Sequence, residues 1–209
     1  MAGFRRDPAR TLASVRALGS PARRSGLLLI VGFVLMIPGI GFAVASQTGS
    51  DFVPPTFDTR AGAVLLITSL SLTALGLVGF AIVLRRAGDR VLSILGVMSY
   101  LGATAAWIAA TVRALTDQRW IYSLEVTFIL AAGCSMLLFG AATIRTGAIP
   151  RWVGWLVTAW SAGALILFAL PSEGYPPLLV QFVPLILGIA LVRTARGTRK
   201  PALAPDPRA

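Results

Sequence analysis

The sequence of 209 residues contains no histidine and a single cysteine, Cys134. Without histidine, the chain cannot form a His-ligated haem or zinc site, an HExxH metalloprotease centre or the Ser–His pair of a rhomboid-type protease. One cysteine allows neither a disulfide within the chain nor a cysteine metal cluster. We therefore expect no metal site and no cofactor.

Charged residues are also scarce: they make up 13% of the sequence, against roughly a quarter in soluble domains. Six apolar stretches fill nearly all of the chain between residues 26 and 192, and they match the roughly 20 residues with which a helix crosses a bilayer. Because lipid offers backbone groups no hydrogen-bond partner, such stretches form helices. They run over Gly26–Ser46, Ala61–Leu84, Val91–Ala114, Ile121–Ile144, Trp152–Leu170 and Pro177–Val192. The sequence therefore predicts an all-α polytopic membrane protein, a compact bundle of six transmembrane helices.

The segments that flank the six stretches are shorter than the ~50 residues of a small folded domain. Residues 1–25 form a basic segment, which is either a short interfacial helix, limited by Gly19 and Pro21, or disordered. Residues 26–192 form the transmembrane domain. Residues 193–209 are a basic tail rich in Pro and Ala, which we expect to be disordered.

The formal net charge of +11 would suit a nucleic-acid-binding protein, but its distribution indicates a membrane topology instead. With a cytoplasmic N-terminus, sixteen of the 19 Lys and Arg residues fall on the inner side, and Arg60, Arg113 and Arg119 fall outside. An excess of Lys and Arg in cytoplasmic loops sets helix orientation. We therefore predict that both termini are cytoplasmic. We also expect the basic flanks to contact anionic lipid headgroups and the protein to bind no nucleic acid.

A cleaved signal peptide is the alternative interpretation of the first apolar stretch. Ala43-Val44-Ala45 has the small-x-small form of a cleavage site and follows basic and apolar segments. The apolar run is, however, longer than the usual ~7–15 residues of a signal peptide. We therefore expect the first helix to be retained.

The acidic residues on the predicted cytoplasmic side, Asp7, Asp89 and Asp206, are far apart in the sequence. A Mg²⁺-dependent lipid-headgroup transferase needs clustered carboxylates on that side. We therefore expect no catalytic residues and no enzymatic activity.

Glu125 is the acidic residue that falls inside an apolar stretch. A carboxylate at membrane depth is costly and by default suggests a function. Arg113 flanks the same short outer loop, and Gln181 lies about one turn inside the outer end of the last stretch. Two interpretations remain open. Glu125 either lines an outward-facing cavity that binds a cation, a proton or a polar substrate, or forms a structural ion pair with Arg113, which we favour.

Small residues at helical spacing predict the faces on which the helices pack closely in lipid. They are Gly102, Ala106 and Ala110 in the third stretch and Gly154, Thr158 and Ala162 in the fifth. Trp152 and Trp155 at the inner end of the fifth stretch are predicted to anchor it at the membrane interface. Arg151 beside them is placed to meet lipid headgroups.

The segment RTGAIPRWVGW, from Arg145 to Trp155, resembles a signature of small uncharacterised bacterial integral membrane proteins. The pattern is G-x-I-P-R-W-x-G-W on the inner loop before the fifth of about six helices, and the closing PLLVQFVPLILGIALVRTARG is similar to that family's last helix. The resemblance implies the fold and supplies no activity. The preference for Arg over Lys, with much Ala and Gly, is similar to proteins from GC-rich bacterial genomes.

These observations predict a multi-pass protein of the bacterial plasma membrane. Its predicted role is non-enzymatic binding or that of an accessory membrane component. Its partner would be another membrane protein or a second copy of the chain. The alternative is a transporter or sensor of a small polar or amphiphilic solute, which uses an outward-facing cavity around Glu125.

Overall fold

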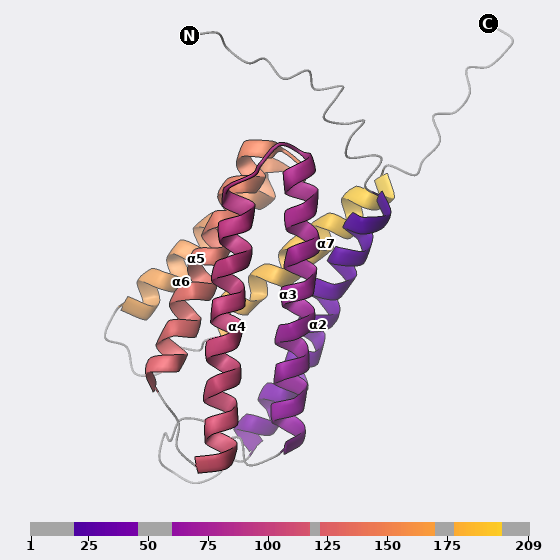
Figure 1. The fold of residues 1–209 in the computed structure, drawn as a ribbon. Coiled ribbons are helices and arrows are strands. Elements are labelled where there is room, and N and C mark those ends of the chain that lie inside the picture. The colour runs from indigo at the N-terminus through magenta and orange to yellow at the C-terminus, as the bar shows by residue number, and fades with distance from the viewer. Residues whose placement is uncertain (1–18, 46–59, 118–121, 170–177, 198–209) are drawn as a thin grey trace, which may run out of the picture.

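The computed structural model describes residues 19–45, 60–117, 122–169 and 178–197. Within these ranges the protein is all-α and has no strand. Six helices follow one another along the chain (Figure 1). They are α2 (Gly19–Ala45), α3 (Arg60–Arg86), α4 (Leu92–Asp117), α5 (Tyr122–Thr146), α6 (Arg151–Ala169) and α7 (Leu178–Gly197).

Five of these helices, α2 to α6, are long and apolar enough to cross a membrane. Each coincides with a stretch for which the sequence predicted a helix, so the all-α prediction is confirmed for the residues that the structure describes. The sixth helix, α7, occupies the last predicted stretch but is not among the five candidate spans. Apart from Gln181 it is apolar up to Val192, and it becomes basic in its last turns, at Arg193 and Arg196.

The first helix begins at Gly19 rather than at Gly26. Pro21 falls in its first turn, where the backbone N–H that proline lacks would have no helical partner. Arg23 and Arg24 therefore lie on α2 itself and not in a segment that precedes it. The remaining predictions for residues 1–18 and for residues 198–209 lie outside the described part of the chain.

Two glycines end helices at one end of the bundle. Gly88 (φ 101°) follows α3 and Gly147 (φ 64°) follows α5, in the left-handed conformation that glycine adopts at little cost. The Asp89 N–H donates to the Leu84 carbonyl at 3.0 Å, and the Gly147 N–H donates to the Thr143 carbonyl at 2.9 Å. The two turns return the chain as tight antiparallel hairpins.

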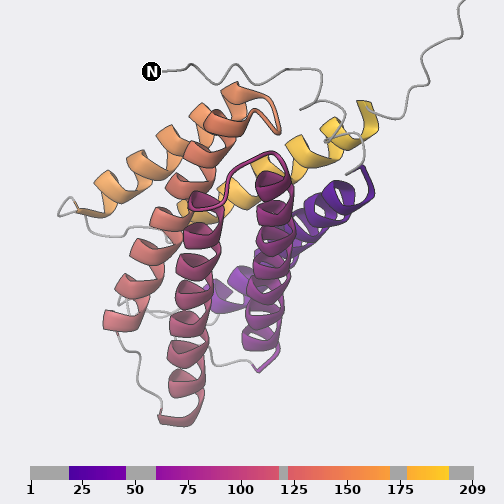
Figure 2. The ribbon, with the colours of Figure 1, turned by 45° about the horizontal axis from the view of Figure 1, so that its top comes forward.

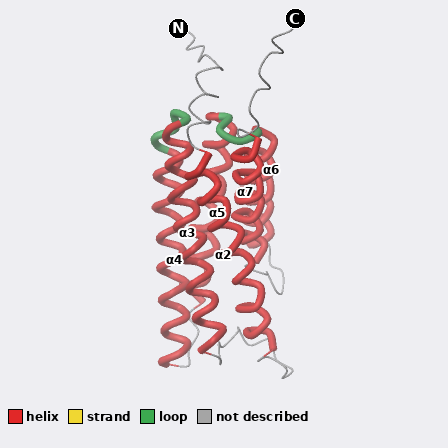
Figure 3. The backbone as a smooth tube through the Cα atoms, turned by 90° about the vertical axis from the view of Figure 1, so that its right-hand side faces the viewer, coloured by secondary structure: helices red, strands yellow, loops and turns green. Residues whose placement is uncertain are grey.

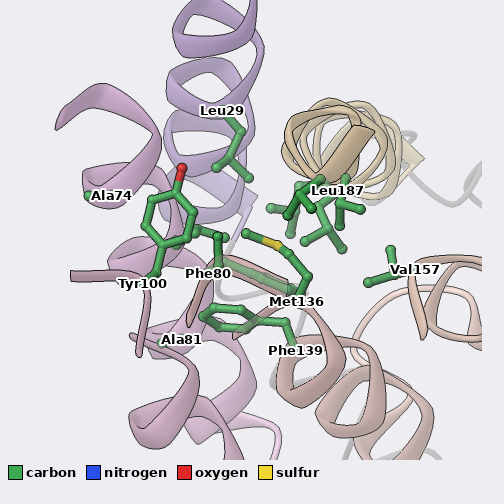
Figure 4. Close-up of a cluster of buried hydrophobic side chains, with 14 of the residues drawn as sticks. Leu29, Ala74, Phe80, Ala81, Tyr100, Met136, Phe139, Val157 and Leu187 are labelled. Carbon is green, nitrogen blue, oxygen red and sulfur yellow. The ribbon is translucent and has the colours of Figure 1, made fainter. Parts of the chain in front are cut away.

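The helices form a closed arrangement in the order α7, α2, α3, α4, α5 and α6, with α6 in contact with α7 (Figures 1 and 2). Each of the six contributes to a buried centre (Figure 4). Its largest members include Leu29, Phe80, Tyr100, Met136, Phe139 and Leu187. Phe80 and Phe139 stack with ring centroids 5.6 Å apart.

The sides of the bundle are apolar and exposed. Met98 (64%), Val64 (62%) and Ile166 (63%) leave most of their surface open, an arrangement that is costly in water and suits lipid. The share of buried residues is lowest in α6 and α4 and highest in α3 and α5. The outermost helices thus have broad faces for lipid or for a partner helix.

One end of the bundle is rich in arginine. The start of α2, the α3–α4 and α5–α6 turns and the end of α7 all lie at this end (Figure 3). All the arginines that the structure describes there have exposed side chains: Arg23, Arg24, Arg85, Arg86, Arg90, Arg145, Arg151, Arg193 and Arg196. At the opposite end, Arg113 is the one arginine whose side chain the structure describes, and it is exposed. We call the end that carries the arginines listed above the arginine-rich end.

Candidate functional site

Glu125 and Arg113 lie at the end of the bundle opposite the arginine-rich end. Glu125 is half-buried in the first turn of α5, and Arg113 is exposed in the last part of α4. One turn deeper than Glu125, Phe128 is buried and packs against Trp107, with ring centroids 4.7 Å apart. This apolar pair lies between Glu125 and the bundle centre. The predicted Glu125–Arg113 ion pair stays a prediction.

Gln181 lies away from the end of the bundle, in its buried interior. Its side chain is 5% exposed, and the hydroxyl of Tyr100, itself buried, donates to Gln181 Oε1 at 3.3 Å. The other amide atom, Gln181 Nε2, is buried and has no hydrogen-bond partner among the described residues. An amide donor in this state costs free energy until a ligand or water accepts its hydrogen bond.

The Tyr100–Gln181 contact continues across the bundle to α3 and α2. The Tyr100 hydroxyl lies beside that of Thr73 on α3. Thr73 Oγ1 donates to the Ser69 carbonyl at 2.9 Å, and Ser69 Oγ donates to the Gly32 carbonyl on α2 at 2.7 Å. Buried polar groups thus link four helices of an otherwise apolar interior.

Ser161 on α6 belongs to the same level of the bundle. Phe182 contacts Phe33 of α2 and Trp160 of α6, with ring centroids 5.1 and 6.3 Å apart. Gln181 and Ser161 are the chain neighbours of two of these aromatic residues, and both are buried. Ser161 Oγ also has no hydrogen-bond partner in the described ranges. We call Ser69, Thr73, Tyr100, Ser161 and Gln181 the polar layer.

The chemistry of the polar layer is hydrogen bonding between uncharged groups. It offers the amide NH₂ group of Gln181 and the hydroxyl of Ser161, which have no hydrogen-bond partner among the described residues. Pro184 adds an acceptor, because its missing N–H leaves the carbonyl of Val180 without its usual helical partner. A small uncharged molecule with a hydrogen-bonding oxygen, or an ordered water, satisfies these groups.

The predicted packing residues differ in their surroundings. A Cβ on Gly154 would lie 3.0 Å from the Gly140 carbonyl oxygen, so α5 and α6 approach closely there. Thr158 also lies against Gly140, and Ala162 is half-buried.

On α4, the predicted stripe turns gradually out of the bundle. Ala110 is buried, Ala106 is half-buried, and Gly102 is exposed with no atom within 4 Å of a Cβ placed on it. The face that contains Gly102 therefore does not pack within the described chain, contrary to the expectation from spacing.

Arg151, Trp152 and Trp155 begin α6 at the arginine-rich end, and all three are exposed. The two tryptophans leave 64% and 62% of their surface open. This placement suits residues that anchor a helix at the membrane interface.

Sequence reasoning found Gln181 but missed its partner Tyr100 and the buried Ser161. Tyr100 carries a usable signal, because a tyrosine hydroxyl inside an apolar helix generally has a hydrogen-bond partner. Ser161 carries none, since serines in membrane helices commonly bond their own backbone, as Ser71 does with the Ile67 carbonyl at 2.8 Å.

Comparison with known proteins identifies no relative: no family model, no curated protein and no solved structure matches the chain. Among the residues that the structure describes, no group of three or more His, Cys, Asp or Glu side chains is placed to hold a metal ion. The chain is shown to be a helical protein with five apolar helices suited to a membrane.

Proposed function

We propose that the chain is a multi-pass protein of a bacterial plasma membrane with six membrane-spanning helices, α7 included. The arginine-rich end supports a cytoplasmic location for the start of α2 and the end of α7. Retention of α2 is supported by its packing, since it buries Leu29 and Met36 and lies against α3 and α7. Anionic lipid headgroups are the proposed contacts of the exposed arginines.

The proposed role is binding, as an accessory component of the membrane, and not catalysis. The observation that carries this proposal is the polar layer, whose open groups are an amide and a hydroxyl. Such groups donate and accept hydrogen bonds but do not exchange protons readily at neutral pH. A membrane protein or a second copy of the chain is the proposed partner, and the exposed faces of α4 and α6 are available to it. The Gly147–Trp155 motif remains our proposed link to small bacterial membrane proteins.

The topology is tested by reporter fusions along the chain. Fusions after Arg90, Arg145 and Ala209 should report the cytoplasm, because arginines accumulate beside these positions. Fusions at Ser50, Asp117 and Glu173 should report the outside. An alkaline-phosphatase signal after Ala209 would show that α7 does not span the membrane or that the orientation is reversed.

Transport or sensing of a small polar solute is the second candidate function. The unbonded Gln181 Nε2 and Ser161 Oγ favour it, because both are buried at one level of the bundle. For this candidate function we propose the polar layer, instead of the surroundings of Glu125, as the place where the solute binds. For Glu125 we retain the structural role, in which the carboxylate pairs with Arg113 near the membrane surface.

A charge-reversal cycle tests the role of Glu125. Glu125→Arg and Arg113→Glu should each lower the melting temperature in detergent modestly, since exposed or partly exposed pairs are worth about 0–1 kcal/mol. The double reversal should restore most of the loss, because the pair is reformed. Additive single effects, together with an ion-dependent melting shift that Glu125→Gln abolishes, would instead assign a binding role to Glu125.

A further inference from the structure

A second group of buried polar atoms lies at the arginine-rich end, between α4 and α5. Asp89 in the α3–α4 turn is 1% exposed, and Ser93 on α4 and Thr143 on α5 are 0% exposed. Asp89 Oδ1, Ser93 Oγ and Thr143 Oγ1 have no hydrogen-bond partner within the described ranges. Buried polar atoms are nearly always satisfied in native proteins, so three such oxygens in one region indicate a place where a ligand or water can bind.

The Asp89 side chain is held in place by the start of α4. Its Oδ2 atom accepts a hydrogen bond from the Ser93 N–H at 2.7 Å, which satisfies one of the free backbone donors of the helix N-terminus. The Asp89 N–H donates to Leu84, and this bond fixes the turn in which Asp89 lies. The second carboxylate oxygen, Oδ1, is left for another partner.

Contacts between α4 and α5 bring Ser93 and Thr143 to the same interface. Gly96 lies against Phe139, because a Cβ on Gly96 would be 3.1 Å from Phe139 Cε2, and Ser135 Oγ donates to the Gly96 carbonyl at 2.7 Å. Ser93 precedes Gly96 by about one helical turn, and Thr143 follows Phe139 by about one turn. Both side chains therefore extend this interface towards the arginine-rich end.

Below this group the interior is apolar. Phe139 stacks on Phe80 beside Ala81 (Figure 4). At the same end, Ala148 and Ile149 in the α5–α6 turn are buried. Water or an ion at Asp89 is thus separated from the bundle centre, and the surface at the arginine-rich end is the nearer one, which is cytoplasmic in the proposed topology.

We propose that Asp89, Ser93 and Thr143 form a binding site for a monovalent cation, with Na⁺ as the ion of best fit. One carboxylate and two hydroxyl oxygens are hard ligands that suit such an ion. Divalent Ca²⁺ and Mg²⁺ take more carboxylates or ordered waters.

The neighbouring arginines do not occupy this position. Arg85, Arg86 and Arg90 have exposed side chains, so their charges are screened by solvent. Their positive charges weaken the binding of a cation at Asp89, but their side chains do not take the cation's place. The site is independent of the polar layer, which lies deeper in the bundle.

The test compares melting of the purified full chain in detergent at fixed pH and ionic strength, with NaCl, KCl or choline chloride. NaCl should raise the melting temperature relative to choline chloride, because an ion that binds the folded state stabilises it. Asp89→Asn should abolish this difference. The asparagine carbonyl can still accept the Ser93 N–H bond, so the start of α4 is preserved.

Ser93→Ala and Thr143→Val should each reduce the Na⁺ effect, which keeps the test decisive if Asp89→Asn folds poorly. The matched control is Thr194→Val, since Thr194 Oγ1 already donates to the Ala190 carbonyl at 2.8 Å and its loss should leave the Na⁺ effect unchanged. Equal melting temperatures in all three salts would overturn the proposal and assign an ordered water to these oxygens. A Na⁺ effect that survives both Asp89→Asn and Thr143→Val would also overturn it.

Discussion

Replacing Gly188 by isoleucine should separate α7 from α2 and strongly destabilise the bundle. A Cβ on Gly188 would lie 2.8 Å from the Gly26 carbonyl oxygen, and one on Gly26 would lie 2.7 Å from the Gly188 carbonyl oxygen. The two backbones thus touch, and no flexible side chain can move aside. Overpacking of a tight contact typically costs ~1–3 kcal/mol, and a branched side chain against backbone should reach or exceed the upper end.

The measurement is the fraction of monodisperse protein after heating in detergent, with Gly163→Ile as the matched control. A Cβ on Gly163 meets no atom within 4 Å, so isoleucine there only adds apolar surface towards lipid. Gly188→Ile should lower the melting temperature sharply and Gly163→Ile only slightly. Similar losses in the two variants would show that α7 does not dock on α2 through this contact.

The contrast among these glycines shows what spacing can predict in a membrane helix. The Gly154–Thr158 spacing predicted a packing face, and Gly154 does lie against Gly140. The same pattern at Gly102 meets open space, because a periodic stripe does not reveal whether a neighbouring helix lies on that side. The Gly26–Gly188 contact joins residues far apart in the chain, and no local pattern pairs them.

The fold itself was predictable for a physical reason. Backbone groups in lipid must bond within their own segment, so apolar length alone predicts each helix. The start of α2 was not predictable in this way. Residues 19–25 are polar and basic, and they form the first turns of the same helix whose later part is apolar. Helix ends that extend beyond the apolar stretch depend on capping and on contacts with neighbours rather than on hydropathy.

The candidate site was predicted in part. Gln181 was recognisable because an amide is rare in an apolar stretch, and it is buried with its Nε2 atom unbonded. Glu125 was singled out because a carboxylate is also rare in an apolar stretch, but the structure places it half-buried in the first turn of α5. Asp89 was considered from the sequence only as one of three scattered acidic residues, and nothing in the sequence indicates that its side chain is buried in the α3–α4 turn.

The last prediction concerns the Tyr100–Gln181 contact at the centre of the polar layer. Tyr100→Phe should destabilise the protein more than Gln181→Met does. The first change leaves the whole buried amide of Gln181 without a partner, at a cost of about 1–3 kcal/mol. The second removes the amide and its unbonded Nε2 atom together, and it leaves the Tyr100 hydroxyl beside Thr73.

The double variant should be more stable than Tyr100→Phe alone, because two apolar side chains then replace a half-satisfied polar pair. This non-additivity distinguishes a hydrogen-bonded pair from two residues that pack independently. The double variant is needed because hydrogen bonds between membrane helices average only about 0.6 kcal/mol, an effect too small to assign from single variants. Ser71→Ala is the control, because Ser71 is exposed and bonds its own helix. Additive losses would mean that Tyr100 and Gln181 do not act together. A Gln181→Met protein that melts far below Tyr100→Phe would mean that a bound molecule already satisfies the Gln181 amide.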